Sequence, residues 1–179
     1  MRGEEVQILG ALTALGSEKM LVCLPGSHSK WAKVIAGEVL EFNTYITGEL
    51  FEAIKANTII GKMINPGSWD DNAFIEGVDH ANSSNNLLNQ LFNVRAKGLF
   101  NQLTPFTAGA FLSGLLIGHE LKEALIDGNL HEICLIGQGR LVTLYEKAIT
   151  HEGFKARTLS SDIIAIGHMK LIKTIRSIT

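Results

Sequence analysis

Three apolar segments follow one another within residues 20–46, and only short turns separate them. Strands that are joined by such short connections pair in the antiparallel direction. Residues 36–38, Ala-Gly-Glu, are typical of a tight hairpin turn between the second segment, 31–35, and the third, 39–46. The sequence therefore predicts a three-stranded antiparallel meander. We expect the core residues of its third strand to include Val39, Phe42 and Ile46.

The last third of the chain has a different pattern, because short apolar strands there alternate with helices. Residues 132–136 and 154–159 have the pattern of strands, and residues 107–125 and 140–150 have the spacing of helices. Strands that are connected through a helix pair in parallel. With a helix predicted over residues 4–15, these elements describe an α/β fold: a mixed five-stranded sheet with helices on both faces. That is the layout of a ribonuclease H-like domain.

A final helix follows the fifth strand. Ser160 or Ser161 has the side chain of a helix N-cap. The helical spacing then predicts one inward face, made of Ile163, Ile164, Gly167, Leu171 and Ile175.

The segment between the two parts of the sheet is predicted to be mostly helical. A helix is expected over residues 48–56, and residues 57–103 are rich in Asn, Gly and Ser. We interpret 57–103 as an insertion of one or two helices, and its apolar periodicity becomes clear only at Leu87, Leu88, Leu91 and Phe92. In the helix over 107–125, glycines at 109, 114 and 118 would let another backbone approach closely. We therefore expect one domain over residues 1–179 with a helical insertion at about 57–103.

Composition excludes several classes of protein. Hydrophobic residues make up 46% of the chain and charged residues 19%, which indicates a globular protein. The formal net charge is -2, which argues against a nucleic-acid-binding protein. Cys23 and Cys134 lie in short apolar runs and are expected to be buried thiols of a reducing compartment. Since the most apolar stretch, 108–116, is too short to cross a membrane, we expect a cytoplasmic protein with no membrane or nucleic-acid partner.

The turn after the first strand carries a chemical pattern. Residues 25–30, Pro-Gly-Ser-His-Ser-Lys, combine a glycine with hydroxyl groups and a cation. A phosphate group binds to backbone N–H groups, hydroxyls and cations on a turn that permits close approach. The candidate phosphate-binding residues are Gly26, Ser27, His28, Ser29 and Lys30. An ordinary polar hairpin turn is the alternative, since the P-loop spacing is absent.

Two further patterns are weaker when each is taken alone. Gly137 and Gly139 follow a predicted strand and precede a helix, an arrangement that brings backbone close to a nucleotide but that also occurs in simple tight turns. Arg2, Glu4 and Glu5 stand at the start of the first helix. The arginine could bind an acidic substrate, and the carboxylates could position a hydroxyl nucleophile. Alternatively, the two glutamates only stabilise the positive N-terminal end of the helix.

Four segments together resemble one family, the 2-dehydro-3-deoxygalactonokinases. They are Met-Arg-Gly-Glu-Glu with the following Gln7, Leu9, Gly10 and Ala11; Leu-Pro-Gly-Ser-His-Ser-Lys-Trp at 24–31; Thr-Gly-Glu-Leu-Phe at 47–51; and Leu-Ser-Gly-Leu-Leu-Ile-Gly at 112–118. The family pattern usually has Thr at the position of Ser27. The resemblance covers nearly the whole chain, in the expected order.

The resemblance implies an actin-like ATPase fold and transfer of the ATP γ-phosphate to 2-dehydro-3-deoxy-D-galactonate. It implies that residues 25–30 are the second phosphate loop and that Gly137 and Gly139 belong to the adenosine site. Glu4 would accept the proton of the attacking hydroxyl, Arg2 would pair with the substrate carboxylate, and Glu5 would support either role.

One departure from the family bears on activity. Such kinases begin with an Asp-x-Gly-Thr phosphate loop whose aspartate holds Mg²⁺, but the first aspartate here is Asp70 and no Gly-Thr pair occurs. We therefore expect the chain to be the C-terminal part of a kinase that lacks the family's N-terminal domain, with no metal site of its own and negligible activity alone. The surface left by the absent domain would favour homo-oligomers.

Two other functions stay open. The first is a non-catalytic ribonuclease H-like module that binds a nucleotide or a partner protein. The second is a hydrolase with a Ser27 or Ser29 nucleophile beside His28, although a Gly-x-Ser-x-Gly elbow is absent.

Overall fold

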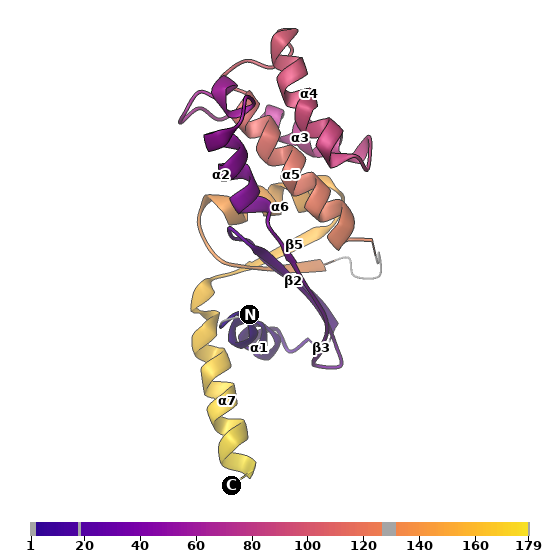
Figure 1. The fold of residues 1–179 in the computed structure, drawn as a ribbon. Helices are drawn as coiled ribbons and strands as arrows, with labels where there is room; N and C mark the ends of the chain where they lie inside the picture. Colours follow the sequence, from indigo (N-terminus) through magenta and orange to yellow (C-terminus); the bar gives the residue numbers. More distant parts are fainter. Residues whose placement is uncertain (1–2, 18, 127–131, 179) are drawn as a thin grey trace. The chain divides into compact units, whose positions relative to one another are not determined.

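The structure is a computed structural model that describes residues 3–17, 19–126 and 132–178. The chain divides into two compact units (Figure 1). We call the first the sheet unit; it comprises the described residues up to Tyr45 and from Glu132 onward. The second, the helical unit, comprises the described residues from Ile46 to Ile126, so that the expected insertion at 57–103 forms part of it.

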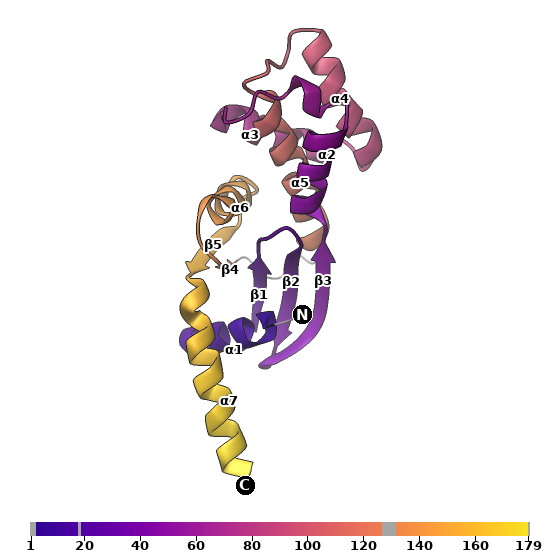
Figure 2. The same ribbon diagram turned by 60° about the vertical axis from the view of Figure 1, so that its left-hand side comes forward.

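A mixed five-stranded sheet forms the centre of the sheet unit, as predicted. Its strands run in the order β3-β2-β1-β4-β5. The pairs β1–β2 and β2–β3 are antiparallel, and the pairs β1–β4 and β4–β5 are parallel. The bounds are Lys19–Leu24 for β1, Ser29–Ile35 for β2, Glu38–Tyr45 for β3, Glu132–Ile136 for β4 and Lys155–Leu159 for β5. Figure 2 shows the three strands of the predicted meander side by side.

Local backbone chemistry sets the meander. Ala36 and Gly37 both have positive φ angles, of 53° and 76°, which match the twist of a two-residue hairpin between β2 and β3. Side chains on both faces of β1 are buried from Met20 to Leu24, as in the inner strand of a sheet covered on two sides.

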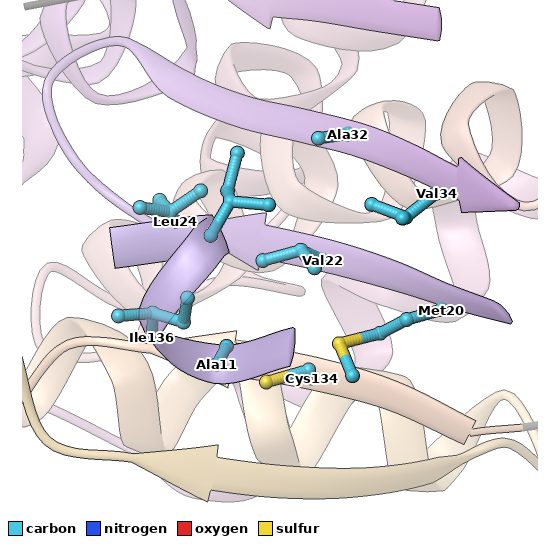
Figure 3. Close-up of a cluster of buried hydrophobic side chains, with 9 residues drawn as sticks. Ala11, Met20, Val22, Leu24, Ala32, Val34, Cys134 and Ile136 are labelled. Atoms are coloured by element: carbon cyan, nitrogen blue, oxygen red, sulfur yellow. The ribbon is translucent and has the colours of Figure 1, made fainter. Parts of the chain in front are cut away.

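Helices cover both faces of this sheet, which was also predicted. On one face, Ile8 and Ala11 of α1 (Glu4–Leu15) pack in one core cluster with Val22 and Cys134 (Figure 3). Helix α7 (Ile164–Ile178) packs on α1 in turn. Side chains alternate across a strand, so Ser29 points to the opposite face, where its hydroxyl meets α6 (Arg140–His151).

Glycines set the contact between α1 and α7. A Cβ atom on Gly10 would lie 2.2 Å from the carbonyl oxygen of Ile163, and one on Gly167 would lie 2.0 Å from that of Val6. Both distances are shorter than any real contact, so the two backbones touch where side chains would otherwise separate them. Between β5 and α7, Ser160 accepts a hydrogen bond from the Asp162 backbone N–H at the start of the short 3₁₀ helix η2 (Ser161–Ile163).

Two predictions of inward-facing residues were partly wrong, one for the third strand and one for α7. Val39 is 44% exposed and Ile46, which follows the strand, is 55% exposed, whereas Phe42 packs against the core. The reason is that β3 is an edge strand that pairs only with β2, so one long side of it has no neighbour. In α7, Gly167 is buried as predicted, but Leu171 and Ile175 are exposed because that half of the helix continues past α1 (Figure 1).

The helical unit consists of four α-helices and one 3₁₀ helix in the part that the structure describes. Their bounds are Thr47–Asn57 for α2, Gly61–Met63 for η1, Asp71–Asn82 for α3, Leu87–Leu99 for α4 and Ala108–Ala124 for α5. N-caps mark two starts: Asp70 accepts from the Ala73 N–H at 2.7 Å, and Asn86 accepts from the Asn89 N–H at 3.1 Å. No described helix combines the length and the apolar character that a membrane span requires.

Close contact between α3 and α5 holds this unit together. Cβ atoms on Gly114 and Gly77 would lie 1.9 Å and 2.2 Å from the carbonyl oxygens of Phe74 and Phe111. Gly118 also lies against α3, at Val78 and Ala81. The predicted close approach at Gly114 and Gly118 is therefore confirmed. At Gly109 a Cβ would meet only the side chain of Ile64, at 3.0 Å.

Candidate functional site

The two glycine-containing turns predicted to touch one ligand leave the same end of the sheet. Strands β1 and β4 are parallel neighbours, and Cys23 on β1 lies opposite Leu135 on β4. Each strand ends one residue later, at Leu24 and Ile136, so the turn after β1 and the turn after β4 start side by side. Both turns therefore follow neighbouring strands of one sheet.

The first of these turns is shorter than predicted. It spans residues 25–28, because Ser29 and Lys30 already belong to β2. Ser27 and His28 are exposed. Gly26 has no positive φ angle, and a Cβ atom there would meet only the His28 backbone, at the ordinary contact distance of 3.7 Å. Neither the backbone conformation nor the packing of the chain therefore requires glycine at position 26.

Lys30 links this turn to the start of α1. Its Nζ donates a hydrogen bond to the His28 carbonyl at 2.8 Å and lies 3.7 Å from Oε1 of Glu4. The side chains of Lys30 and Glu4 are 17% and 25% exposed, so both reach the surface while largely shielded from solvent. The ion pair places a carboxylate from α1 and a cation from β2 beside the turn, although the two residues are far apart in the sequence.

The remaining residues at the start of α1 differ in what they do. Glu5 is exposed, and its Oε2 accepts a hydrogen bond from the Gly3 N–H at 3.1 Å, so that it satisfies a donor at the helix end. Gly3 itself has a φ angle of 105°, which favours glycine. Arg2, the predicted partner of a substrate carboxylate, lies outside the described residues.

Ser29 has surroundings unlike those of the rest of the predicted phosphate loop. It is fully buried, and its Oγ lies 2.7 Å from Oη of Tyr145 on α6. Tyr145 is itself 1% exposed. Helix α6 begins directly after Gly139. The hydrogen bond therefore links Ser29, which follows the first turn, to α6, which follows the second turn.

Tyr145 is the residue of this region that sequence reasoning missed. Its position on the apolar face of the predicted helix marked it as a core residue, and nothing near it in the sequence pointed to Ser29. A buried tyrosine hydroxyl needs a hydrogen-bonding partner. That need is the one feature of the sequence that could have indicated a polar residue packed against Tyr145.

The second turn has the backbone that its glycines suggest. Gly137 and Gly139 have φ angles of 150° and 82°, both in the range that favours glycine. A side chain at Gly137 would also come within 2.9 Å of Val142, whereas no described atom lies within 4 Å of a Cβ at Gly139. The first turn of α6 follows, with N–H groups that have no partner within the helix.

Neither metal ligands nor reactive thiols gather in the described part of this region. No cluster of three or more His, Cys, Asp or Glu side chains that would hold a metal occurs among residues 3–17, 19–126 and 132–178. Cys23 and Cys134 form no disulfide and are buried in β1 and β4. Burial raises the pKa of the Cys134 thiol from 9.0 to about 11, against a smaller lowering by Arg157.

Comparison with known proteins gives one consistent answer. The model of the 2-keto-3-deoxy-galactonokinase family matches residues 1–171. The chain is 40% identical over 167 residues to a Rhizobium meliloti (strain 1021) protein assigned as a 2-dehydro-3-deoxygalactonokinase, and 33% identical over 163 residues to the Escherichia coli (strain K12) 2-dehydro-3-deoxygalactonokinase. Each match takes in 90% of this chain but 55% of the relative. The chain thus spans about half the length of the curated relatives it matches.

A solved structure agrees with this result. The crystal structure of a Sinorhizobium meliloti protein assigned as a 2-dehydro-3-deoxygalactonokinase superimposes with a TM-score of 0.90 at 37% identity. The superposition covers 98% of this chain and 60% of that one. Since the family match extends over almost the entire sequence, the chain belongs to the 2-keto-3-deoxy-galactonokinase family.

Proposed function

We propose that the chain is the C-terminal part of an ATP-dependent kinase that phosphorylates 2-dehydro-3-deoxy-D-galactonate. The names of the two curated relatives support this substrate. The observation that carries the proposal is the placement of the two turns, at 25–28 and 137–139, on the same end of neighbouring parallel strands. Open α/β sheets bind ligands at the carboxyl ends of such strands.

The topology supports the finer fold assignment, to the ribonuclease H-like group of actin-like ATPases. Three antiparallel strands are followed by two strands that add in parallel on the β1 side, in the order β3-β2-β1-β4-β5. Helices lie on both faces, and the helical unit is placed between β3 and β4 in the chain. In this assignment the whole chain is one kinase domain, with residues 57–103 as its helical insertion.

Residues 26–28 with Lys30 form the proposed phosphate loop. Gly26 supports this role because glycine is needed there neither by the φ angle nor by the chain's own packing. Close approach of an outside group explains it, since a phosphate oxygen takes the space of a missing side chain. The exposed Ser27 and His28 would donate to the phosphate, and Lys30 would contribute charge. The buried Ser29 would not contact the phosphate but would hold the loop in place through its hydrogen bond with Tyr145.

Gly137 and Gly139 form the proposed adenosine contact. Their backbone leaves β4 next to the phosphate loop and turns directly into α6. Glycines keep this turn free of side chains, so a flat base or ribose can lie against the peptide planes. The distance from the end of β1 to the end of β4 is that between neighbouring strands, about 5 Å, which is short enough for one nucleotide to touch both turns.

Glu4 is the proposed catalytic base. Its carboxylate is partly shielded and held by Lys30, next to the phosphate loop. It would take the proton of the attacking sugar-acid hydroxyl while the oxygen forms a bond to the γ-phosphorus and the bond to the β–γ bridging oxygen breaks, so that ADP leaves. Arg2 would pair with the substrate carboxylate, and Glu5 would order the start of α1.

Catalysis in this proposal needs a segment outside the present sequence. Mg²⁺ would neutralise the phosphate charge that develops during transfer, and its aspartate ligand is expected in the N-terminal domain of the longer relatives. The described residues hold no metal cluster of their own, so this chain contributes nucleotide and substrate contacts. We place such a kinase in the cytoplasm, with ATP and a sugar acid as its partners.

A second candidate keeps the same fold without catalysis. A protein that covers 55% of its kinase relatives and acts alone would be a non-catalytic module that binds a nucleotide or a partner protein. Isothermal titration with ATP tests the nucleotide-binding form of this candidate, because such a module binds ATP without a second domain. Turnover by the joined protein described next distinguishes a kinase from a module.

The decisive experiment joins the N-terminal portion of the Rhizobium meliloti relative to this chain. We expect ADP release with ATP, Mg²⁺ and 2-dehydro-3-deoxy-D-galactonate from the joined protein and none above background from the chain alone. Glu4→Gln should abolish turnover with an unchanged circular dichroism spectrum, and Glu5→Gln is the matched control with at most a few-fold loss. Robust turnover by the chain alone, or by the Glu4→Gln variant, would contradict the proposal.

A further inference from the structure

Helix α4 carries large apolar side chains on the face that points away from its own unit. Its buried residues are Gln90 and Val94, which lie on the face toward α3 and α5. On the opposite face stand Leu88, Phe92, Arg95 and Leu99, which we call the α4 stripe. Leu88 is 81% exposed, Phe92 56% and Leu99 61%. The predicted periodicity at Leu88 and Phe92 is therefore real, but these residues do not face the core.

The spacing of the α4 stripe is that of a helix–helix seam. Its members follow one another at intervals of four, three and four residues, the repeat that brings one side of a helix against another in knobs-into-holes packing. Monomeric proteins seldom leave contiguous apolar patches on their surface. Each end of the stripe carries a leucine. A second helix would therefore find an apolar contact at both ends of α4, with Phe92 and Arg95 between them.

The positions of the stripe are symmetric about a midpoint between Asn93 and Val94. Leu88 and Leu99 lie equally far from that midpoint, and so do Phe92 and Arg95. An antiparallel copy of α4 would therefore place Leu88 on Leu99 of the second copy and the Phe92 ring on the guanidinium of Arg95. An arginine over an aromatic face is attractive, and a two-fold axis makes both contacts twice.

We propose that the α4 stripe is the interface of a homodimer, in which two copies of α4 pack antiparallel across a two-fold axis. A parallel pair would instead stack Arg95 on Arg95 of the second copy, a contact between like charges. The stripe holds no carboxylate that would neutralise that contact. The proposal stands on the helical unit alone, so it does not depend on the kinase assignment.

The interface should be small. Helix α4 has 13 residues, which makes it about 20 Å long, and contacts of that size bind weakly and reversibly. The association is therefore expected to depend on concentration. Replacing one leucine of the stripe by a charged residue should raise the dissociation constant at least about tenfold, since a charge would be buried against an apolar partner.

Sedimentation equilibrium of the 179-residue chain over a wide concentration range tests the proposal. We expect a monomer–dimer equilibrium that Leu88→Lys and Leu99→Glu each weaken at least about tenfold. The double variant Leu88→Lys/Leu99→Glu should recover the dimer, because the two-fold axis sets the introduced lysine against the introduced glutamate of the other copy. Ile126→Lys changes an equally exposed apolar residue, 80% exposed, outside α4 and should leave the equilibrium unchanged.

Circular dichroism confirms that each variant folds, and disulfide trapping adds a measurement that tolerates a weak dimer. Chains with Leu88→Cys mixed with chains with Leu99→Cys should form mixed disulfides faster than either chain alone forms its own. A monomer at every concentration would overturn the proposal and would leave the stripe to a segment of a longer protein. A dimer that Leu88→Lys does not weaken, or a double variant that stays monomeric, would equally overturn it.

Discussion

The sheet unit and the helical unit bury their side chains by different means. In the sheet unit, aliphatic residues on β1 and β4 alternate between two faces, and polar residues collect in the turns at the strand ends. In the helical unit, α3 and α5 touch backbone to backbone through Gly77 and Gly114. In the sheet unit, the register of the strands determines where the turns lie. In the helical unit, α3 and α5 lie close together because glycines leave no side chain between them.

The helical unit also has a polar group at its centre. Gln90, 1% exposed, donates from its Nε2 to the His80 carbonyl at 2.5 Å and to the Ser83 hydroxyl at 3.0 Å, and its Oε1 accepts from His119. Lys122 donates to the backbone carbonyls of Ala81 and Ser84. Helices α3, α4 and α5 are therefore joined by hydrogen bonds as well as by apolar contacts. His119 is half-buried in this network.

Each unit contains its own spectroscopic or chemical reporter. Trp31 belongs to β2 and Trp69 to the helical unit, and both cysteines lie in the sheet unit. Single-tryptophan variants therefore follow one unit at a time by fluorescence. The predictions below use this separation and run from the largest expected effect to the smallest.

Gly114→Ala should be the most damaging single change. A Cβ atom there would lie 1.9 Å from the Phe74 carbonyl oxygen, and α3 and α5 would have to move apart. We expect a loss of about 3 kcal/mol in the free energy of unfolding of the helical unit, measured by urea titration of Trp69 fluorescence. Gly109→Ala is the matched control on the same helix, because it meets only the Ile64 side chain. Equal losses for the two variants would contradict backbone contact as the cause.

Tyr145→Phe tests the sheet unit in the corresponding way. The substitution keeps the buried ring and leaves the Ser29 hydroxyl without the contact at 2.7 Å. Loss of this buried hydrogen bond should cost about 0.5–1.5 kcal/mol, which urea titration of Trp31 fluorescence would measure. Faster amide hydrogen exchange should appear at 26–28 and 137–139, because the bond joins the elements next to both turns. If the double variant Tyr145→Phe/Ser29→Ala loses as much stability as the two single variants added together, the two hydroxyls do not act as a pair.

Acidification should weaken the helical unit more than the sheet unit. Burial lowers the pKa of His80 and of His119 below 6.5, and nearby Lys97 and Lys122 respectively add to this effect, while Glu76 opposes it at His80. His80 also lowers the pKa of His119. As the pH falls below about 6.5, the unfolded chain binds protons first. The free energy of unfolding therefore decreases until the pH passes the lowered pKa values, and no further loss from these groups follows.

Urea titration of Trp69 fluorescence at pH 7.5 and at pH 5.5 measures this change. His119→Gln removes one of the two titrating groups and should flatten the pH dependence, because the amide still offers a donor to Gln90. His168→Gln, on the exposed surface of α7, is the control. A helical unit that is as stable at pH 5.5 as at pH 7.5 would contradict the role given to the two histidines.

Apolar periodicity predicted the strands and helices of both units. It did not predict which element packs against each apolar face. The meander, α1 and α6 were predictable because each rests on residues near one another in sequence. The glycines of α5 indicated a close backbone approach, but not that α3 makes it. Val39, Phe92 and Ile175 illustrate the limit. An apolar spacing identifies the face of an element, whereas the neighbour that covers this face depends on an edge, a helix length or a second molecule.

The candidate site shows the same division. The family resemblance implied that the turn after β1 and the turn after β4 serve one nucleotide, and the parallel pairing of β1 with β4 sets both turns at one end of the sheet. The hydrogen bond between Ser29 and Tyr145 was not predictable, because 116 positions separate the two residues in the sequence. The contact of Glu4 with Lys30 likewise depends on how α1 lies on the sheet. Local chemistry therefore indicated candidate residues, and tertiary packing decides how each of them is held.

Thiol chemistry provides the smallest expected signal and the sharpest test of the two-unit division. Cys23 and Cys134 are buried in the sheet core, and burial raises the pKa of Cys134 to about 11. About one thousandth of such a thiol is ionised at pH 8, and the thiolate is the reactive form. Iodoacetamide should therefore leave the native chain unmodified for hours and modify both residues in urea, as mass spectrometry would show.

The same reaction distinguishes the two units in the destabilised variants. Gly114→Ala should leave the thiols protected, since it loosens only the helical unit, whereas Tyr145→Phe should make them react faster because their own sheet opens more often. If Gly114→Ala exposed the cysteines as readily as Tyr145→Phe, the two units would unfold together, and the glycine contacts of α3 and α5 would stabilise the sheet as well as the helices around them.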